Sequence, residues 1–345
     1  MNGRVDALRR SLEEPLLVTN GTNVRYLTGF DSSNAALLVE RDDLTLFADF
    51  RYAAAGRAVE GVRFVETKRS LAAALAEQLS GRIGFEADTV VYAAYETLAA
   101  GGLELVPRRG LVEGLRAVKD ENEVDSIRGA SEVTTKAFEQ LAEEPFLGRS
   151  ERELAWRLEI LLHEHGGEGL AFDIGLGAGP NGALPHAHPS DRLVTEGDLV
   201  VVDAGAVVDG YCSDCTRTFA AGTPPPDLAQ AYAVCLEAQL AALAAVRPGV
   251  TGVEADWAAR GVIEEAGFGG AFGHGLGHGV GLLIHEAPRL STESSDTLAA
   301  GNVFSVEPGI YLEGAGGIRI EDLVVLREEG PEILTGFTKE LVQVG

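Results

Sequence analysis

The sequence predicts two domains, an α/β domain at the N-terminus and an α+β domain at the C-terminus. Three observations support this organisation. The chain has 345 residues, more than one hydrophobic core usually serves. Its first 110 or so residues alternate short apolar runs with helical ones, and the remainder combines helix start signals with longer apolar runs and hairpin turns. We expect the boundary near residue 118, which gives domains of residues 1–118 and 119–345.

Short apolar runs in the first domain are typical of strands bounded by polar turns. They predict strands at residues 16–19, 35–40, 44–48, 63–66, 83–86 and 103–106. Two longer stretches, 71–79 and 91–99, predict helices. Strands that alternate with helices in this way indicate a small α/β domain.

Helix signals in the second domain begin with the segment LRAVKDENEV, which opens a long helical stretch. Ser150 with Glu153, and Thr251 with Glu254, form capping boxes ahead of two further helices. Asp227 is expected to cap an Ala/Leu-rich helix that runs to about Val246. Between these helices lie four segments that read as strands: LVVVDAGAVV, YCSDCTRTF, FSVEPGIYL and IRIEDLVVL.

Composition narrows the class of protein. A formal net charge of −25 argues against nucleic acid and anionic membrane surfaces as partners. No stretch approaches the roughly 20 apolar residues of a membrane span, and the charged N-terminus has no signal-like apolar core. Three cysteines are too few for a disulfide framework. We therefore expect a soluble cytoplasmic protein.

Two aspartates are predicted to meet on one hairpin. The dipeptide Asp209-Gly210 between two apolar runs is a strong signal for a tight turn. With this dipeptide at the turn, Asp203 opposes Thr216, and Asp214 lies two residues along on the same face, about 7–8 Å away at the backbone. Side chains at that spacing can reach inward to ions about 3.5–4 Å apart. The alternative is a polar hairpin face. It does not explain why Asp203 directly follows four apolar residues, where its carboxylate would be buried without a partner.

Two glutamates form a second predicted pair. Glu307 and Glu321 are each seven residues from Gly314, so a return of the chain near this glycine sets them opposite each other. The alternative is a pair of surface glutamates. However, the apolar residues on either side of each glutamate, in the segments FSVEP and IRIED, are expected to be buried. A buried ionised carboxylate is costly unless it is paired, hydrogen-bonded or bound to a cation.

Three of the seven histidines lie within the segment HGLGHGVGLLIHE: His274, His278 and His285. An H-x-x-x-H spacing on a helix can bind zinc. Here the alternating glycines disfavour a helix, at about 1 kcal/mol each. The segment is therefore predicted to be extended and closely packed, with one histidine as a metal ligand and the others available to a substrate.

The candidate ligands are mostly oxygens, since they comprise four carboxylates and one imidazole. Such a set favours Mn²⁺ or Co²⁺, with Zn²⁺ or Fe²⁺ possible, over a thiolate zinc site. Cys212 and Cys215 have C-x-x-C spacing, which can indicate zinc or redox chemistry. Packed thiols are the preferred interpretation, because Asp214 lies between them on a strand.

At these residues the sequence resembles the pita-bread metallopeptidases, the family of methionine aminopeptidases, aminopeptidase P and prolidase. The family pattern is an Asp, ten residues, a second Asp, then a distal His, Glu and Glu. It is matched here by Asp203, Asp214, His278, Glu307 and Glu321. The resemblance spans residues 119–345. It extends to the N-terminal domain, where NVRYLTGF and FADFRY look like the small Xaa-Pro peptidases.

The resemblance implies a ligand arrangement for two divalent metal ions. Asp203 resembles a chelating ligand of one ion, and His278 and Glu307 resemble ligands of the other. Asp214 and Glu321 resemble the carboxylates that bridge the two ions.

The resemblance also implies roles for residues around the metals. His186 and His285 look like histidines that contact the substrate and steady the scissile carbonyl. His274 and Arg319 match the proline-specific branch of the family. Glu307 is the candidate proton shuttle for a metal-activated hydroxide that attacks the bond before proline.

Several functions remain open from the sequence. A dipeptidase (prolidase) is preferred to an aminopeptidase P that acts on longer peptides. A methionine aminopeptidase is disfavoured by His274 and by the N-terminal domain. A metal-free binding relative and a creatinase-like amidinohydrolase are disfavoured by the complete ligand set. A dipeptidase needs a cation for the substrate carboxylate, and Arg51 is a candidate; a surface arginine or an internal salt bridge is the alternative.

The resemblance also implies partners. Short proline-containing peptides are the expected substrates. Relatives in the family are commonly dimers, so a homodimer with its contact in the N-terminal domain is expected.

Overall fold

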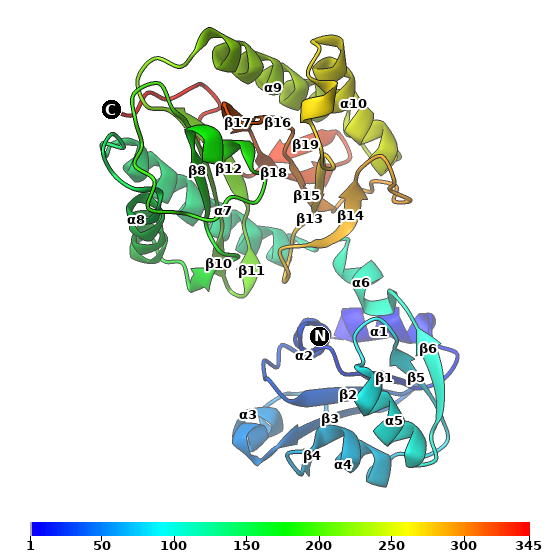
Figure 1. Cartoon of the computed structure of the whole chain (residues 1–345). Helices are drawn as coiled ribbons and strands as arrows, with labels where there is room; N and C mark the ends of the chain where they lie inside the picture. Colours follow the sequence, from blue (N-terminus) through cyan, green and yellow to red (C-terminus); the bar gives the residue numbers. More distant parts are fainter. Residues whose placement is uncertain (1) are drawn as a thin grey trace. The chain divides into compact units, whose positions relative to one another are not determined.

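The computed structural model describes residues 2–345. By their contacts these residues form two compact units, with the division between Arg116 and Ala117. Each unit has its own sheet structure and its own hydrophobic core (Figure 1).

The N-terminal unit is built on one mixed six-stranded sheet, in the order β4-β3-β2-β1-β5-β6. Strands β1, β2 and β3 pair antiparallel, and the remaining neighbours pair parallel. The bounds are β1 (Leu16–Val18), β2 (Ala35–Val39), β3 (Leu44–Asp49), β4 (Arg63–Thr67), β5 (Arg82–Glu86) and β6 (Glu104–Arg108). All six predicted strands are confirmed within a few residues at each end.

Helices surround this sheet. The two predicted helices are confirmed as α4 (Leu71–Gln78) and α5 (Tyr92–Ala100). Their residues Leu75 and Leu98 pack on Leu17 and Phe47 of the sheet. Further helices were not predicted, since most are short and α2 carries β-branched residues: α1 (Asn2–Arg10), α2 (Gly21–Thr28), α3 (Ala53–Arg57) and α6 (Leu111–Arg116), with the 3₁₀ turn η1 (Phe50–Tyr52).

The C-terminal unit contains four long helices: α7 (Glu121–Ala142), α8 (Glu151–Glu164), α9 (Pro226–Ala245) and α10 (Gly252–Glu265). Both predicted capping boxes form, at Ser150 and at Thr251. A third, at Asp120, was not predicted. The prediction for Asp227 is wrong: Pro225 occupies the cap position, and Asp227 lies inside the first turn. The proline fixes the start of α9, which leaves no capping role for the aspartate.

Helix α9 is longer and more apolar than the sequence analysis expected of any stretch in this chain. Within the described residues it is the one helix whose length and composition would allow a membrane crossing, with a mean hydropathy of 1.4. One such helix is weak evidence, because core helices pass the same test. Its residues Ala231, Cys235, Ala238 and Ala242 are fully buried and pack against α10 and the strands.

The strands of this unit form several antiparallel sheets between the helix pairs (Figure 1). Helices α7 and α8 pack on one half, α9 and α10 pack on the other, and the first turns of α7 also contact the second half. The first half contains β7 (Gly169–Leu170), β8 (Gly175–Ala178), β9 (Leu199–Ala204), β10 (Ala206–Val208), β11 (Tyr211–Cys212) and β12 (Cys215–Ala220). The second half contains β13 (Gly277–Gly279), β14 (Glu286–Leu290), β15 (Val303–Val306), β16 (Gly309–Leu312), β17 (Gly316–Arg319), β18 (Asp322–Arg327) and β19 (Gly330–Ile333). Two 3₁₀ turns complete the unit, η2 (Gly179–Ala183) and η3 (Gly269–Ala271).

The predicted register of the first hairpin is confirmed. Asp209 and Gly210 both have positive φ, 50° and 76°, as a tight hairpin turn of the I′ type requires. Asp203 pairs with Thr216 in β9 and β12. The fold class predicted from the sequence is thus confirmed, with an α/β unit followed by an α+β unit.

The predicted return of the chain at Gly314 is also confirmed. Strands β16 and β17 pair around this glycine, with Gly309 opposite Arg319, and β15 and β18 continue in the same register. Continued through the gap between the two sheets, that register places Glu307 opposite Glu321. Both hairpins are interrupted where they carry acidic residues, since Asp214, Glu307 and Glu321 lie between strands rather than within them.

Candidate metal centre

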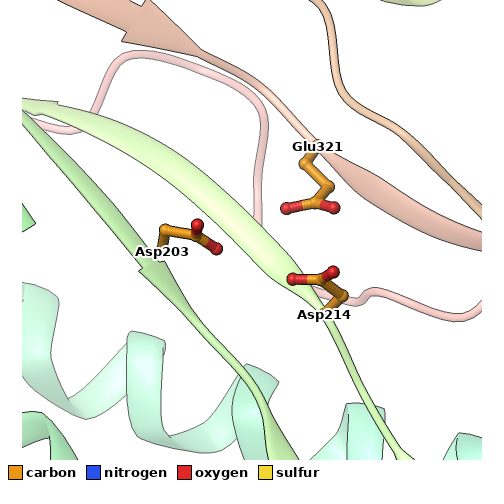
Figure 2. Close-up of side chains that lie close together, drawn as sticks. All are labelled: Asp203, Asp214 and Glu321. Atoms are coloured by element: carbon orange, nitrogen blue, oxygen red, sulfur yellow. The ribbon is translucent and has the colours of Figure 1, made fainter. Parts of the chain in front are cut away.

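Three carboxylates converge between the two halves of the C-terminal unit. Asp203, Asp214 and Glu321 each offer an oxygen, and these oxygens lie within 4.8 Å of one another. Figure 2 shows the three side chains pointing toward a common space. Asp203 comes from β9, Asp214 from the gap before β12, and Glu321 from the gap before β18. The two hairpins therefore supply the cluster jointly.

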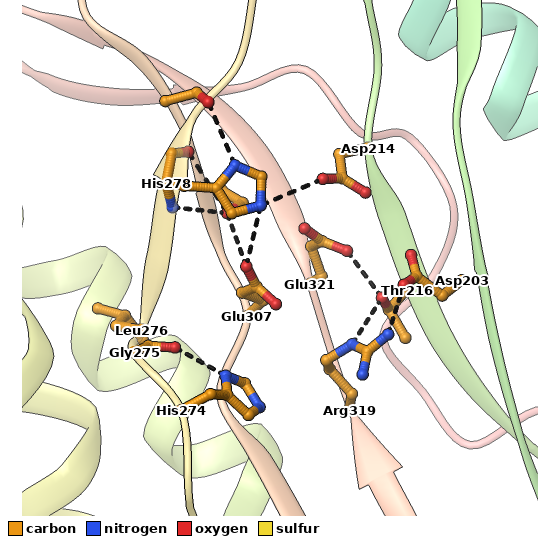
Figure 3. A network of polar contacts seen from close by, with 12 residues as sticks. Asp203, Asp214, Thr216, His274, Gly275, Leu276, His278, Glu307, Arg319 and Glu321 are labelled. Carbon is orange, nitrogen blue, oxygen red and sulfur yellow. Dashed lines mark hydrogen bonds and ion pairs between the residues drawn. The ribbon is translucent and has the colours of Figure 1, made fainter. Parts of the chain in front are cut away.

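His278 and Glu307 extend the cluster on its other side (Figure 3). The Nε2 atom of His278 lies 3.6 Å from Oδ2 of Asp214 and 3.3 Å from Oε1 of Glu307. Its Nδ1 atom lies 3.2 Å from the carbonyl oxygen of Gly279. If Nδ1–H donates to that carbonyl, Nε2 presents a lone pair to the carboxylates, as a metal-binding imidazole must. All five predicted ligands are thus brought together, and Asp214 is shared by the two groups.

The glycines around His278 explain why this segment is a strand. A Cβ atom on Gly277 would lie 2.0 Å from the carbonyl oxygen of Ser305, and one on Gly279 would lie 2.1 Å from that of Ala287. Only glycine permits such close approach of neighbouring backbones. The prediction of an extended, closely packed segment is confirmed, and it brings the His278 ring to the carboxylates.

A buried polar network holds the acidic side chains in place (Figure 3). Arg319 donates to Oδ2 of Asp203 at 2.5 Å and, through Nε, to Oγ1 of Thr216 at 2.9 Å. The Thr216 hydroxyl in turn donates to Oε2 of Glu321 at 2.8 Å. On the other side, Ser305 donates to Oε1 of Glu307 at 3.1 Å. Asp203, Glu307 and Glu321 are therefore each oriented by a second group.

Without a cation the charges of this cluster oppose one another. Burial is the main cause that raises the pKa of Asp214, Glu307 and Glu321, and the neighbouring carboxylates raise the pKa values of all three further. Burial likewise lowers the pKa of His278, which favours the neutral imidazole. A positive charge in the centre would stabilise all of these groups in the form that binds metal.

The residues fit a pair of divalent cations. Oδ1 of Asp203 is buried and, among the described residues, has no hydrogen-bond partner. Buried polar atoms are normally satisfied, so an atom of this kind beside two other carboxylates points to a cation. Carboxylate oxygens with one imidazole suit Mn²⁺, Co²⁺, Zn²⁺ or Fe²⁺. The set contains no thiolate ligand, and all three cysteines are buried free thiols.

The other predicted histidines surround this cluster. His285 is exposed, and its ring centroid lies 4.3 Å from that of His278. His274 lies farther along, with Nε2 2.9 Å from the Tyr311 hydroxyl. His186 is exposed on the loop after η2. Desolvation is the main cause that lowers the pKa of His274 and His285. The carbonyl of Pro185, the residue before His186, accepts from Nη1 of Arg319 at 3.0 Å, which places His186 beside the site.

Arg51 belongs to the N-terminal unit. Its guanidinium forms a bidentate ion pair with the buried carboxylate of Asp49, at 2.9 Å and 2.7 Å. The internal salt bridge that the sequence left open is therefore present. The Arg51 side chain is still 37% exposed, so one edge of the guanidinium remains accessible.

Comparison with known proteins assigns the family. The model of metallopeptidase family M24 matches residues 125–328, and the creatinase/prolidase N-terminal domain matches residues 4–118. The chain belongs to metallopeptidase family M24. It is a hydrolase, and dependence on two metal ions is typical of this family.

Several relatives match this M24 chain over nearly its full length. It is 39% identical over 334 residues to an uncharacterised peptidase, YqhT, of Bacillus subtilis, covering 95% of each chain. Among solved structures it is similar to an Xaa-Pro dipeptidase from Bacillus anthracis, with 36% identity, a TM-score of 0.95 and 99% of each chain covered. It is also similar to an X-Pro aminopeptidase from Thermotoga maritima, with 35% identity and a TM-score of 0.88. The match covers 96% of this chain and 97% of the other.

Sequence reasoning missed two polar residues of this M24 site. Thr216 was placed opposite Asp203 by the predicted register, but no role was inferred for its hydroxyl. The Tyr311 hydroxyl accepts from Nη1 of Arg319 at 3.0 Å and lies 2.9 Å from Nε2 of His274, and burial raises its pKa to about 12. The word VEPGIY contains Tyr311, but only the folded hairpin shows that it turns back to the site.

Proposed function

We propose that this M24 metallopeptidase is an Xaa-Pro exopeptidase that prefers dipeptides, that is, a prolidase. The observation that carries the proposal is the convergence of Asp203, Asp214, His278, Glu307 and Glu321 on one buried site. The resemblance to Xaa-Pro dipeptidases over the whole chain supports the substrate class. The similarity to an X-Pro aminopeptidase keeps longer peptides as the second candidate.

The five ligands would hold two divalent ions, with Mn²⁺ or Co²⁺ preferred. When bound, the ions supply Lewis acidity and lower the pKa of water, so that a nucleophile is available near neutral pH. Glu307 would carry the proton, because its carboxylate belongs to the ligand set, beside the place where the ions would hold the water. The leaving nitrogen of proline has no hydrogen, and this proton is the one it needs.

The histidines would act on the substrate. His285 is exposed beside His278 and can donate to the carbonyl oxygen as negative charge develops on it. His186 and His274 would contact the peptide from the loop after η2 and from the Tyr311 side. Arg319 remains bound to Asp203, Thr216 and Tyr311, so we assign it to orienting the site rather than to the chemistry.

Arg51 would bind the carboxylate of a dipeptide. Its guanidinium already pairs with Asp49, so a substrate carboxylate would have to use the exposed edge. We also propose a cytoplasmic homodimer whose contact involves the N-terminal unit, an inference from the family alone.

The test is hydrolysis of Ala-Pro, Ala-Pro-Ala and Met-Ala-Ala by chelated protein, with and without added Mn²⁺. Metal-dependent cleavage confined to Ala-Pro is the expected result. Preference for Ala-Pro-Ala would make the protein an aminopeptidase P. Cleavage of Met-Ala-Ala alone would contradict the proline-specific assignment.

The same assay tests Arg51. Arg51→Ala should raise the KM for Ala-Pro and leave metal content unchanged. Unchanged turnover of Ala-Pro would remove Arg51 from the substrate site.

A further inference from the structure

One buried carboxylate outside the metal centre makes an unusual set of contacts. Glu151 is the first residue of α8, and it is fully buried. Oε1 accepts from the Ala178 amide at 2.8 Å and from the Asn181 side chain at 3.0 Å. Oε2 accepts from the Ser190 amide at 2.9 Å and the Ser190 hydroxyl at 2.6 Å. A single side chain therefore holds residues that are twelve positions apart in the chain.

Those residues are the two ends of the segment 178–190, which carries His186. This segment leaves β8, forms η2 and then has no regular structure until β9. His186 is exposed, so burial of its own side chain does not fix its position. The position of an exposed residue on a loop depends on what anchors the loop ends.

The middle of the same segment lies directly against the metal centre. A Cβ atom on Gly317 would lie 1.8 Å from the carbonyl oxygen of Gly182, so the segment packs on β17 at backbone distance. The carbonyl of Pro185, the residue before His186, accepts from Nη1 of Arg319 at 3.0 Å. This hydrogen bond holds the backbone next to His186 against the site.

The chemistry of the contacts requires a carboxylate. The groups that Glu151 meets are donors: two amides, a side-chain NH₂ and a hydroxyl. A carboxylate offers acceptors at both oxygens, whereas the amide of glutamine would turn an NH₂ toward donors. Capping of α8 does not explain the residue, because Ser150 and Glu153 already form the capping box.

We propose that Glu151 is a positioning residue that fixes the segment 178–190, and through it places His186 for substrate binding. It contacts none of the five candidate ligands, so it controls substrate recognition separately from metal binding. The role of His186 rests on the function proposed above, whereas the anchoring of the segment does not.

The first experiment follows the segment itself. Hydrogen exchange of residues 178–190 is measured by mass spectrometry in the metal-loaded wild-type protein, Glu151→Gln and Glu153→Gln. Glu153 is the matched control, since it has the same chemistry two residues along the same helix but caps α8 at Ser150. We expect exchange to be at least about tenfold faster in Glu151→Gln. Equal exchange in both variants would overturn the proposal.

The second experiment asks whether Glu151 acts through His186. The kcat and KM for Ala-Pro are measured for Glu151→Gln, His186→Ala and the double variant, with metal content determined for each. Glu151→Gln should lower kcat/KM by roughly 10–100-fold at unchanged metal content. In the His186→Ala background the same change should have little further effect.

Two outcomes would contradict this mechanism. Equal losses from Glu151→Gln in both backgrounds would mean that Glu151 does not act through His186, and loss of metal would assign it to the metal centre. Ser190→Ala removes one donor to Oε2 and serves as a milder variant if Glu151→Gln does not fold. A wild-type protein that fails to cleave Ala-Pro would refute the proposed function, and the exchange experiment would still decide the anchor.

Discussion

A small hydroxyl group links the charged residues of the metal centre. The Thr216 side chain is fully buried, accepts from Nε of Arg319 and donates to Oε2 of Glu321. An isosteric valine would leave both partners unsatisfied. An unsatisfied buried polar group costs about 1–3 kcal/mol, more when it is charged.

Thr216→Val is expected to weaken metal binding. We predict a 10–100-fold loss of affinity for Mn²⁺, because Glu321 would lose the group that orients it. Isothermal titration of chelated protein measures this. The control is Thr218→Val on the same strand, since Thr218 is also buried but bonds the backbone of Arg319. If both variants bind Mn²⁺ as the wild-type protein does, the orienting role of Thr216 is wrong.

Glu86 is a buried acid in the N-terminal unit, remote in sequence from the metal centre. Burial raises its pKa, although Asn23 and the amides of Thr19 and Asn20 donate to its carboxylate. A raised folded-state pKa gives stability that is complete below the unfolded value of about 4.5 and is lost as pH rises through the folded value.

Glu86→Gln should therefore change how stability depends on pH. As pH rises from about 4.5 to 7, the wild-type protein should lose free energy of unfolding that the variant keeps. Replacing one carboxylate oxygen by an NH₂ group also lowers the stability of the variant, but by an amount that does not change with pH. The slope of unfolding free energy against pH is therefore the quantity that tests the prediction. Urea unfolding at several pH values, read by hydrogen exchange of residues 82–86, measures it. Parallel curves for the two proteins would show that Glu86 has no raised pKa.

At the scale of elements, strand β13 illustrates how backbone packing positions a ligand. Gly277 lies so close to β15 that any side chain must push the strands apart. His278 follows directly, and its amide donates to the Ser305 hydroxyl at 3.1 Å. The position of the imidazole is therefore set by the separation of two strands.

Gly277→Ala is predicted to destabilise the fold by about 1–3 kcal/mol and to lower metal affinity, because overpacking moves β13 and with it His278. Gly273→Ala is the matched control, since a Cβ atom there meets nothing within 4 Å. Urea unfolding and metal titration of the two variants test this. If the two variants have equal stability and equal metal affinity, β13 can accommodate a Cβ atom at residue 277 and the packing argument is wrong.

At the scale of the whole molecule, the metal centre joins two halves of the catalytic unit that each carry like charges. Asp203 and Asp214 belong to the half packed on α7 and α8, and Glu307 and Glu321 to the half packed on α9 and α10. Without cations, these carboxylates repel one another across the centre. Metal binding should therefore contribute to global stability as well as to catalysis.

Mn²⁺ is expected to raise the melting temperature of chelated protein. A site filled at a hundred times its dissociation constant adds about 2.7 kcal/mol. For a unit of this size that corresponds to several degrees, at about 2–4 °C per kcal/mol. Asp214→Asn should be more stable than the wild-type protein when metal-free, because one buried charge is removed, and should gain less from Mn²⁺. Calorimetry that shows equal gains for both proteins would contradict this.

Much of the architecture could be predicted from the chain because the signals are local. Alternating apolar runs, two capping boxes and the Asp209-Gly210 turn each depend on a few neighbouring residues. The short helices of the N-terminal unit were missed because their stability comes from packing on the sheet rather than from propensity. Asp227 was misassigned because a proline had already fixed the helix start.

The sequence by itself determined the fold class and the four acidic candidate ligands, since two hairpin registers specify which side chains share a face. Its resemblance to the pita-bread metallopeptidases added the family and His278. Only the tertiary structure decided how the hairpins meet, which residues orient the ligands and what anchors the loop of His186. Thr216, Tyr311 and Glu151 act through partners that are far away in the chain. Such contacts depend on how separate elements pack together, and no local pattern of residues encodes them.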